Sequence, residues 1–264
     1  MTTTTVSSPR SLRLPRISRV RLIQVLGLAG FLAFWQAGGA ALPYLYSQPT
    51  RIVADMFVLF TQRNGFGLLW NTLYVLIIGL AISIVAGVII GTLLGRFRTF
   101  GIMFEPYFAA LYSVPRVAFV PLMVVWFGIG QAFVIAAVVF AVTILIVFST
   151  AAGVKETRRA YSEVATSFRI TGVTFFSKVL IPGSIPFIAT GVRLGVQRGL
   201  VAVIVGEFLI GLAGIGRMLR EARVESLTDR MFATAIIAML AGMIMLTITG
   251  WVERRFSRWR PISF

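Results

Sequence analysis

Long apolar runs alternate with short polar segments along most of this chain. Each long run has about twenty or more residues, the length that an α-helix needs to cross the hydrocarbon core of a bilayer. The pattern therefore predicts six membrane-spanning helices and an all-α membrane protein. The predicted spans cover residues 22–42, 70–95, 102–127, 132–153, 187–210 and 231–252.

The proline and glycine content of two of these spans predicts how the helices bend and pack. The span 102–127 contains Pro106, Pro115 and Pro121, and proline removes a backbone donor, so we expect this helix to be kinked or broken. The span 70–95 carries glycines near fourfold spacing, which favours close helix packing. They are Gly79, Gly87, Gly91 and Gly95. Outside the spans, a short amphipathic helix is expected at 51–62, and 211–230 is expected to be a polar loop.

The first span follows a Thr/Ser-rich and then Arg-rich arm, residues 1–21. Two interpretations of 22–42 remain open: a retained span, or a signal peptide with the sequence AGGAA as its cleavage region. The length favours a retained span, because the apolar core of a signal peptide has about 7–15 residues. This interpretation divides the chain into the arm 1–21, a membrane domain 22–252 and a tail 253–264.

A polar and aromatic segment, residues 156–186, interrupts the apolar pattern between the fourth and fifth spans. Its sequence is ETRRAYSEVATSFRITGVTFFSKVLIPGSIP. Positions Ala160, Tyr161, Val164, Ala165 and Phe168 share one helical face. Gly172 then provides a break, and a second short helix is expected to stop before Pro182. Such an amphipathic hairpin needs a partner to cover its apolar face, so the pattern predicts a docking element.

The composition supports the membrane assignment and excludes several classes of enzyme. The chain is 58% hydrophobic and 13% charged, with mean hydropathy +0.90, and it has no cysteine and no histidine. This removes disulfides, thiol nucleophiles, imidazole bases and the usual zinc ligands, so we expect no metal and no cofactor. Its lysines, Lys155 and Lys178, do not stand in a GxxxxGK[ST] sequence. Any ATP hydrolysis must therefore occur on another chain.

Basic residues are distributed unequally between the two sides of the predicted spans. The arm, the 96–101 turn, the 154–186 segment and the tail together hold 16 of the 25 Lys and Arg residues, against 6 in the opposite loops. The positive-inside rule then predicts that both termini and the 156–186 segment are cytosolic.

The 156–186 segment resembles the cytosolic signature of inner-membrane permease subunits of bacterial ABC importers, in which EAA is followed by a glycine and later by I-x-L-P. Counted back from Pro182, Glu163, Val164 and Ala165 stand where EAA occurs. Arg169 takes the glycine position, and the next glycine is Gly172. The resemblance implies that seven residues of this segment couple to an ATPase. They are Glu163, Val164, Ala165, Phe168, Arg169, Gly172 and Pro182.

Two further stretches, 113–131 and 182–219, are similar to permeases that import nitrate, taurine and aliphatic sulfonates. The resemblance implies a type I ABC importer fold with six spans in the bacterial inner membrane. It also implies a homodimer, two copies of an ATPase subunit, an extracytoplasmic solute-binding protein and a small, polar, anionic solute. We expect contact with lipid and none with nucleic acid. The competing hypothesis is a stand-alone secondary transporter or channel driven by an ion gradient.

Charged residues inside spans are costly, so they usually face a cavity or a partner. Arg116, Arg193 and Arg198 are therefore candidates for a translocation pathway, because a guanidinium binds anionic oxygens well. For Arg193, the alternatives are snorkelling to the cytosolic headgroups or a structural pair with a carboxylate such as Glu105. Glu207 lies near the outer end of the fifth span, and the resemblance implies a role at the outer gate; the alternative is a salt bridge with Arg217 or Arg220. The loop 211–230 is expected either to meet the solute-binding protein or to be a solvated turn.

Overall fold

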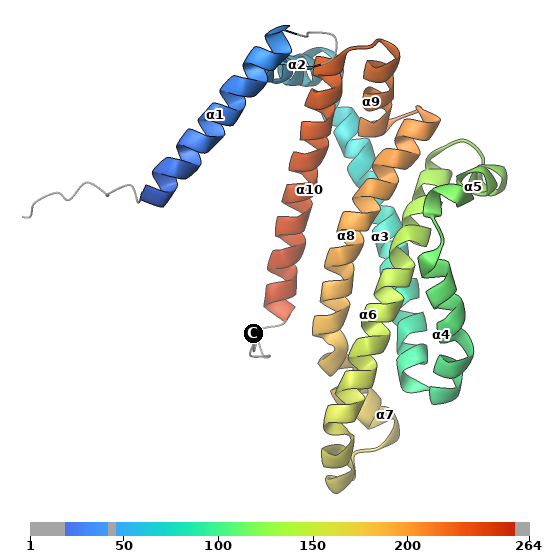
Figure 1. Cartoon of the computed structure of the whole chain (residues 1–264). Helices are drawn as coiled ribbons and strands as arrows, with labels where there is room; N and C mark the ends of the chain where they lie inside the picture. The colour runs from blue at the N-terminus through green and yellow to red at the C-terminus, as the bar shows by residue number, and fades with distance from the viewer. Residues whose placement is uncertain (1–18, 42–45, 257–264) are drawn as a thin grey trace, which may run out of the picture.

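The computed structural model describes residues 19–41 and 46–256, and this part of the chain is helical throughout, without strands (Figure 1). Residues 1–18 of the predicted arm and 257–264 of the predicted tail lie outside the described residues. The described elements are α1 (Arg19–Ala41), α2 (Pro49–Gln62), α3 (Gly65–Arg96), α4 (Arg98–Ser113), η1 (Arg116–Phe119), α5 (Val120–Phe127), α6 (Gln131–Ser167), α7 (Gly172–Phe175), η2 (Phe176–Leu180), α8 (Ile181–Ile210), α9 (Gly214–Val224) and α10 (Thr228–Phe256).

The long helices confirm the all-helical membrane fold. Five of them are long and apolar enough to cross a bilayer, and there are six when the bent pair α4 and α5 is counted as one span. The expected short helix before the second span is α2. It begins with Pro49, and proline is tolerated there because a backbone N–H in the first turn has no hydrogen-bond partner within the helix. In Figure 1, most of α1 slants away from the bundle, and its C-terminal end lies beside α2. The side chains of α1 are mostly exposed, although Trp35 contacts Phe232 of α10.

The centre of the molecule is formed by α3, α6 and α8, which lie side by side (Figure 1). Buried aliphatic and aromatic residues of α6, including Phe133, Val138 and Ile146, form its core. The glycines of α3 face α6 so closely that a Cβ at Gly79 would lie 2.5 Å from Val138, and one at Gly87 would lie 2.7 Å from Ile146. The expected close packing of this glycine-rich span is confirmed, and its partner is α6.

The predicted break in the third span occurs at one of its three prolines. Pro106 lies inside α4, and Pro121 lies in the first turn of α5, where helices tolerate proline. At Val114 and Pro115 the backbone is extended, and the chain bends by 93° between α4 and the η1–α5 segment. Proline disfavours the helical conformation at the residue before it, which explains why the break falls here. Arg116 is the first residue after the bend.

The prediction of a polar loop or solvated turn at 211–230 is wrong, because this segment contains the amphipathic helix α9. Ile215, Met218 and Ala222 of α9 are buried against the bundle, while its arginines are on the exposed side. The helix ends with Ser226 in a left-handed conformation, φ 55°, and the Leu227 N–H bonds back to the Ala222 carbonyl. The apolar pattern of α9 extends over only three turns and lies among charged residues, so it is a weak signal in the sequence.

Candidate functional site

The segment expected to couple to an ATPase projects from one end of the bundle (Figure 1). Helix α6 continues through Ser167 without interruption, so it spans 37 residues and is roughly 55 Å long. This exceeds the approximately 30 Å hydrocarbon core of a bilayer. The expectation of a separate first hairpin helix is therefore wrong: no residue between 154 and 167 breaks helices, and the span and the predicted first helix are one rod.

The break in this segment lies at Arg169, the position where the signature has glycine. Arg169 adopts a left-handed backbone conformation, φ 55°. The Arg169 N–H bonds to the Thr166 carbonyl at 2.9 Å, and the Ile170 N–H bonds to the Ala165 carbonyl at 2.8 Å. These are the two hydrogen bonds of a Schellman motif, which usually places glycine where Arg169 stands. Gly172 also has a positive φ, 62°, so the turn uses two left-handed residues.

The chain after the turn forms one continuous helical rod from α7 through η2 into α8. The prediction that a second short helix stops before Pro182 is wrong. The widened π-helical turn η2, Phe176–Leu180, precedes Pro182, and α8 begins at Ile181. Pro182 thus lies in the first turn of an α-helical segment, where a missing N–H is tolerated. The turn is therefore joined to the fifth span without a break in the helix.

The tip of this segment presents apolar side chains to the outside. Val164 is 53% exposed, Phe168 72% and Val173 79%, whereas Ala165 is buried. Glu163 is also exposed and, in the described part of the chain, forms no salt bridge. Its possible partner Arg158 instead donates to the Arg96 carbonyl at 3.0 Å. The exposed surface of Glu163, Val164, Phe168 and Val173 is hereafter the coupling surface.

A second feature is a cavity of about 420 Å³ beside the bend of the third span. Its walls come from the end of α4, the bend, α5, α6 and α8. Arg116, from the bend, and Arg198, from α8, both line it. The structure therefore brings together two of the three arginines that the sequence places inside spans.

Neither arginine of this cavity is neutralised. Within residues 19–41 and 46–256, no carboxylate forms a salt bridge with Arg116 or Arg198. The guanidinium of Arg116 lies 5.9 Å from the ring centre of Tyr112, and its buried Nε has no hydrogen-bond partner. Because buried polar groups are nearly always hydrogen-bonded, the Nε of Arg116 is a donor that remains available to an acceptor from outside the described residues.

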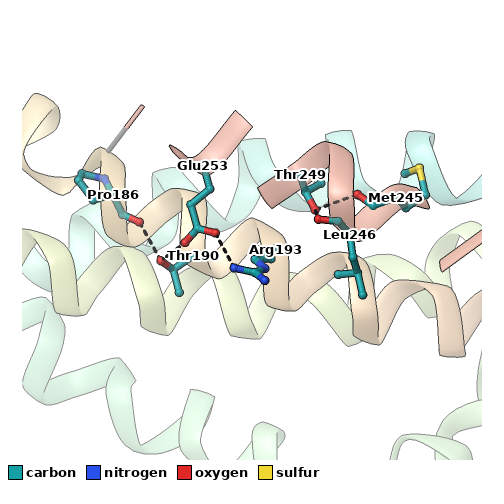
Figure 2. Close-up of polar contacts among 7 residues, drawn as sticks. All are labelled: Pro186, Thr190, Arg193, Met245, Leu246, Thr249 and Glu253. Atoms are coloured by element: carbon teal, nitrogen blue, oxygen red, sulfur yellow. Dashed lines mark hydrogen bonds and ion pairs between the residues drawn. The ribbon is translucent and has the colours of Figure 1, made fainter. Parts of the chain in front are cut away.

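The third arginine, Arg193, is held elsewhere. Figure 2 shows the Glu253 carboxylate of α10 reaching Thr190 and Arg193 of α8. The Arg193 Nη1–Glu253 distance is 3.1 Å, and the Thr190 hydroxyl donates to the other carboxylate oxygen at 2.8 Å. The predicted alternative of a structural pair with a carboxylate is confirmed, but the carboxylate is Glu253. The named example, Glu105, forms its salt bridge with Lys155 at 2.8 Å instead. The Arg193–Glu253 pair joins the fifth and sixth spans.

Glu207 lies near the opposite end of α8 and is only 3% exposed. Its carboxylate accepts hydrogen bonds from the Thr72 hydroxyl of α3 at 2.8 Å and from the Gly216 N–H at the start of α9 at 3.0 Å. The Thr72 oxygen in turn accepts from the Ile215 N–H at 2.8 Å. A carboxylate at a helix N-terminus is favourable because the first N–H groups are otherwise unpaired. This hydrogen-bonded set, Thr72, Glu207, Ile215 and Gly216, is hereafter the outer latch.

Two glycines allow the outer latch to form. Gly214 has φ 81°, and a Cβ there would overlap the Glu207 carboxylate. A Cβ at Gly216 would lie 2.5 Å from the Glu207 Cβ. The sequence GLAGIG is thus explained by the close approach of α9 to α8.

The predicted alternative of a salt bridge from Glu207 to Arg217 or Arg220 is wrong. Arg217 pairs with Glu221 on its own helix at 2.7 Å. Arg220 donates to the carbonyls of Leu209 and Ile210 at 3.2 and 2.8 Å, at the C-terminus of α8. A cation there complements the partial negative charge of the last carbonyls.

Two residues of these sites were missed in the sequence, namely Thr72 and Glu253. Thr72 is one of few hydroxyl residues in an apolar span, and Glu253 is the first charge after the sixth span, but many such residues have no special role. In the described part of the chain, no group of three or more acidic residues is placed to hold a metal ion.

Comparison with known proteins agrees with this architecture. Residues 83–258 match the family model described as binding-protein-dependent transport system inner membrane component. The chain is 28% identical over 245 residues to the bicarbonate transport system permease protein CmpB of Synechococcus elongatus, covering 88% of each chain. It is 27% identical over 252 residues to the taurine transport system permease protein TauC of Escherichia coli, covering 92% of this chain and 91% of that one.

The fold is also similar to a solved structure, the crystal structure of an amino acid ABC transporter with histidines. The TM-score is 0.56 at 18% sequence identity, over 73% of this chain and 92% of that chain. This similarity concerns the fold alone.

Proposed function

The chain belongs to the family of binding-protein-dependent transport system inner membrane components, and we propose that it moves a small anionic solute across the inner membrane. It is the transport subunit of an ABC importer and not an enzyme, and ATP hydrolysis belongs to the partner ATPase. A solute-binding protein is the other partner implied by the family. We propose that the solute belongs to the nitrate, taurine or aliphatic sulfonate class. The similarity to CmpB adds bicarbonate to these candidate solutes.

The observation that carries this proposal is the cavity with two arginines that lack a salt bridge. Arg116 and Arg198 line one cavity at the bend of the third span and along the fifth span. Two positive charges without a carboxylate are unfavourable in a membrane unless an anion neutralises them for part of the transport cycle. We therefore assign the anion-binding role in the pathway to Arg116 and Arg198.

We assign different roles to the other two pathway candidates. Arg193 and Glu253 would fix α10 to α8, so that the fifth and sixth spans move together. A charge reversal tests this assignment: Arg193→Glu should reduce uptake, and the added Glu253→Arg should restore it. Failure of restoration would contradict the assignment. Glu207 would act at the outer gate by positioning α9 through the outer latch.

We propose that the coupling surface docks in a groove of the ATPase subunit and that this contact transmits the energy of ATP hydrolysis to the spans. The signature residues Glu163, Val164, Ala165, Phe168, Arg169 and Gly172 lie in or directly beside this projecting turn, and Pro182 lies beyond η2, in the first turn of α8. Exposed apolar side chains around one carboxylate are suited to a groove with apolar walls and a polar rim. Because α7, η2 and α8 are continuous, closure of the ATPase would tilt the wall of the cavity that carries Arg198.

The proposed assembly has two copies of this chain, two ATPase subunits and one solute-binding protein, surrounded by lipid. A single copy leaves large apolar side chains exposed on α4, including Ile102 at 69% and Tyr107 at 67%. A second copy or lipid must cover them. Both termini are proposed to be cytosolic, because the basic residues predominate on the side of the coupling segment.

Reconstitution in vesicles tests the proposed function. The chain is purified with its ATPase, incorporated in proteoliposomes and supplied with the solute-binding protein and a radiolabelled anion. We expect uptake that requires ATP on the ATPase side and stops when the ATPase active site is inactivated. Uptake driven by an ion gradient without the ATPase would instead favour a secondary transporter, and it would overturn the proposal.

A further inference from the structure

We propose that the cavity of Arg116 and Arg198 accepts a monovalent oxyanion with an apolar body, such as an alkanesulfonate or alkanecarboxylate. It would discriminate against nitrate, bicarbonate and taurine. This inference rests on the proposed function, because it assigns the class of solute to the same site. The cavity walls contributed by this chain carry the argument.

The cavity is almost entirely apolar apart from its two guanidiniums. Of its 16 lining residues, the polar side chains are Arg116, Arg198 and the hydroxyl of Tyr112. The remaining lining residues are apolar, among them Met123, Phe133, Phe140, Ala141, Ala202 and Val205. Met123, Phe133 and Ala141 are themselves buried, so one wall of the cavity is a closed hydrocarbon surface.

The size of the cavity exceeds what a small inorganic anion needs. A volume of about 420 Å³ lies within the approximate range of 300–1,000 Å³ that is usual for organic ligands. Nitrate and bicarbonate have no apolar part, so they would leave the aliphatic wall in contact with water. An alkyl chain would displace that water, and each buried CH₂ strengthens binding by about fourfold.

The charge of the cavity selects a headgroup. Arg116 and Arg198 both line the cavity, and a guanidinium binds the oxygens of a sulfonate or carboxylate well; the buried Nε of Arg116 lacks an acceptor that such a group can supply. Taurine carries an ammonium group as well as a sulfonate. No carboxylate lines the cavity, so the ammonium would be buried without a partner, at a high cost in affinity.

Direct binding to the purified permease–ATPase complex in lipid nanodiscs tests this inference. The probes are methanesulfonate, ethanesulfonate, propanesulfonate, butanesulfonate, butanoate, pentanoate, taurine and nitrate, measured by calorimetry without the solute-binding protein. We expect affinity to rise by roughly sixtyfold from methanesulfonate to butanesulfonate, at about fourfold for each of three CH₂ groups. Taurine should bind at least tenfold more weakly than propanesulfonate. Pentanoate has the same number of CH₂ groups as butanesulfonate, so this pair shows which headgroup is preferred.

Three variants and one control locate the binding site. Arg116→Gln and Arg198→Gln should each reduce the butanesulfonate affinity by tenfold or more, while Arg51→Gln, on the exposed surface of α2, should leave it unchanged. Ala202→Leu keeps both charges and fills part of the cavity. It should weaken butanesulfonate binding while leaving methanesulfonate binding nearly unaltered, which a folding defect would not do.

Several results would overturn the inference while the proposed function stands. These are an affinity independent of chain length, equal binding of nitrate and butanesulfonate, or wild-type binding in both arginine variants, in a complex that still performs ATP-driven uptake. Chain-length-dependent binding without ATP-driven uptake would instead contradict the proposed function and leave the assignment of the cavity intact.

Discussion

The hydroxyl of Thr72 in the second span donates to the carboxylate of Glu207 in the fifth span at 2.8 Å. The same Thr72 oxygen accepts the Ile215 N–H at the start of α9, and Glu207 accepts the Gly216 N–H. Two spans and an outer helix are therefore joined by one buried polar set. This arrangement fixes α9 at the end of the bundle opposite the coupling surface (Figure 1).

Thr72→Val should loosen the outer latch. Valine has nearly the shape of threonine but lacks the hydroxyl, so the buried Ile215 N–H loses its acceptor and the Glu207 carboxylate loses one donor. We expect a loss of about 1–3 kcal/mol in stability and a reduced rate of uptake. Thermal unfolding in detergent and uptake in proteoliposomes measure the two effects. Thr61→Val is the control, because Thr61 is exposed and its hydroxyl donates within its own helix at 2.7 Å. Equal behaviour of both variants would refute the role of Thr72.

Gly214→Ala should displace α9. The added Cβ would overlap the Glu207 carboxylate, and alanine is strained at φ 81°. We expect a lower melting temperature and a gain in labelling at a cysteine introduced at Ile215, which is buried in the wild type. The chain has no native cysteine, so such labelling is specific. Gly27→Ala is the matched control, because no atom lies within 4 Å of a Cβ at that position. Unchanged labelling in Gly214→Ala would contradict the close approach.

Arg169→Gly should be tolerated in the coupling turn. Glycine adopts the left-handed conformation of this position without the roughly 1–2 kcal/mol penalty of other residues. The variant should keep ATPase association and uptake, whereas Arg169→Val should reduce both, because a β-branched residue is strongly disfavoured at positive φ. Co-purification with the ATPase measures the effect. If glycine is as harmful as valine, then the guanidinium and not the turn is what this position requires.

Glu163→Lys should abolish docking of the ATPase while the chain still inserts in the membrane. Glu163 is exposed and forms no salt bridge within the described residues. Reversing its charge therefore changes the coupling surface and little else. The assay is co-purification with the ATPase, with Glu156→Lys as the control for a charge reversal at an exposed position of the same helix. Normal co-purification of Glu163→Lys would refute the docking role.

The fold was largely predictable from the sequence because its main signals are strong. Apolar runs of about twenty residues match the thickness of the bilayer, and a central proline restricts the backbone of the residue before it. The α9 helix was missed, because its apolar positions are few and they are buried through contacts with distant parts of the chain, chiefly α8 and α10. Pro182 was misinterpreted, since a preceding π-helical turn, which has no sequence signal, lets the helix continue.

The sites were predictable only in part. The local sequence identifies the coupling turn, and the structure adds that Arg169 takes the left-handed position itself. By contrast, the Thr72–Glu207 pair joins residues 135 positions apart, and Thr190 and Arg193 reach Glu253 across about sixty residues. Such pairs depend on which helix faces lie together. Side-chain spacing along one span does not reveal this.

The most direct test of the account is ATP-driven uptake of a labelled anion by the reconstituted importer with Arg198→Gln, compared with Arg51→Gln. We predict that Arg198→Gln keeps the assembled complex and reduces the uptake rate by at least tenfold, while Arg51→Gln transports as the wild type does. Wild-type uptake by an assembled Arg198→Gln complex would contradict the claim that this cavity binds the transported anion.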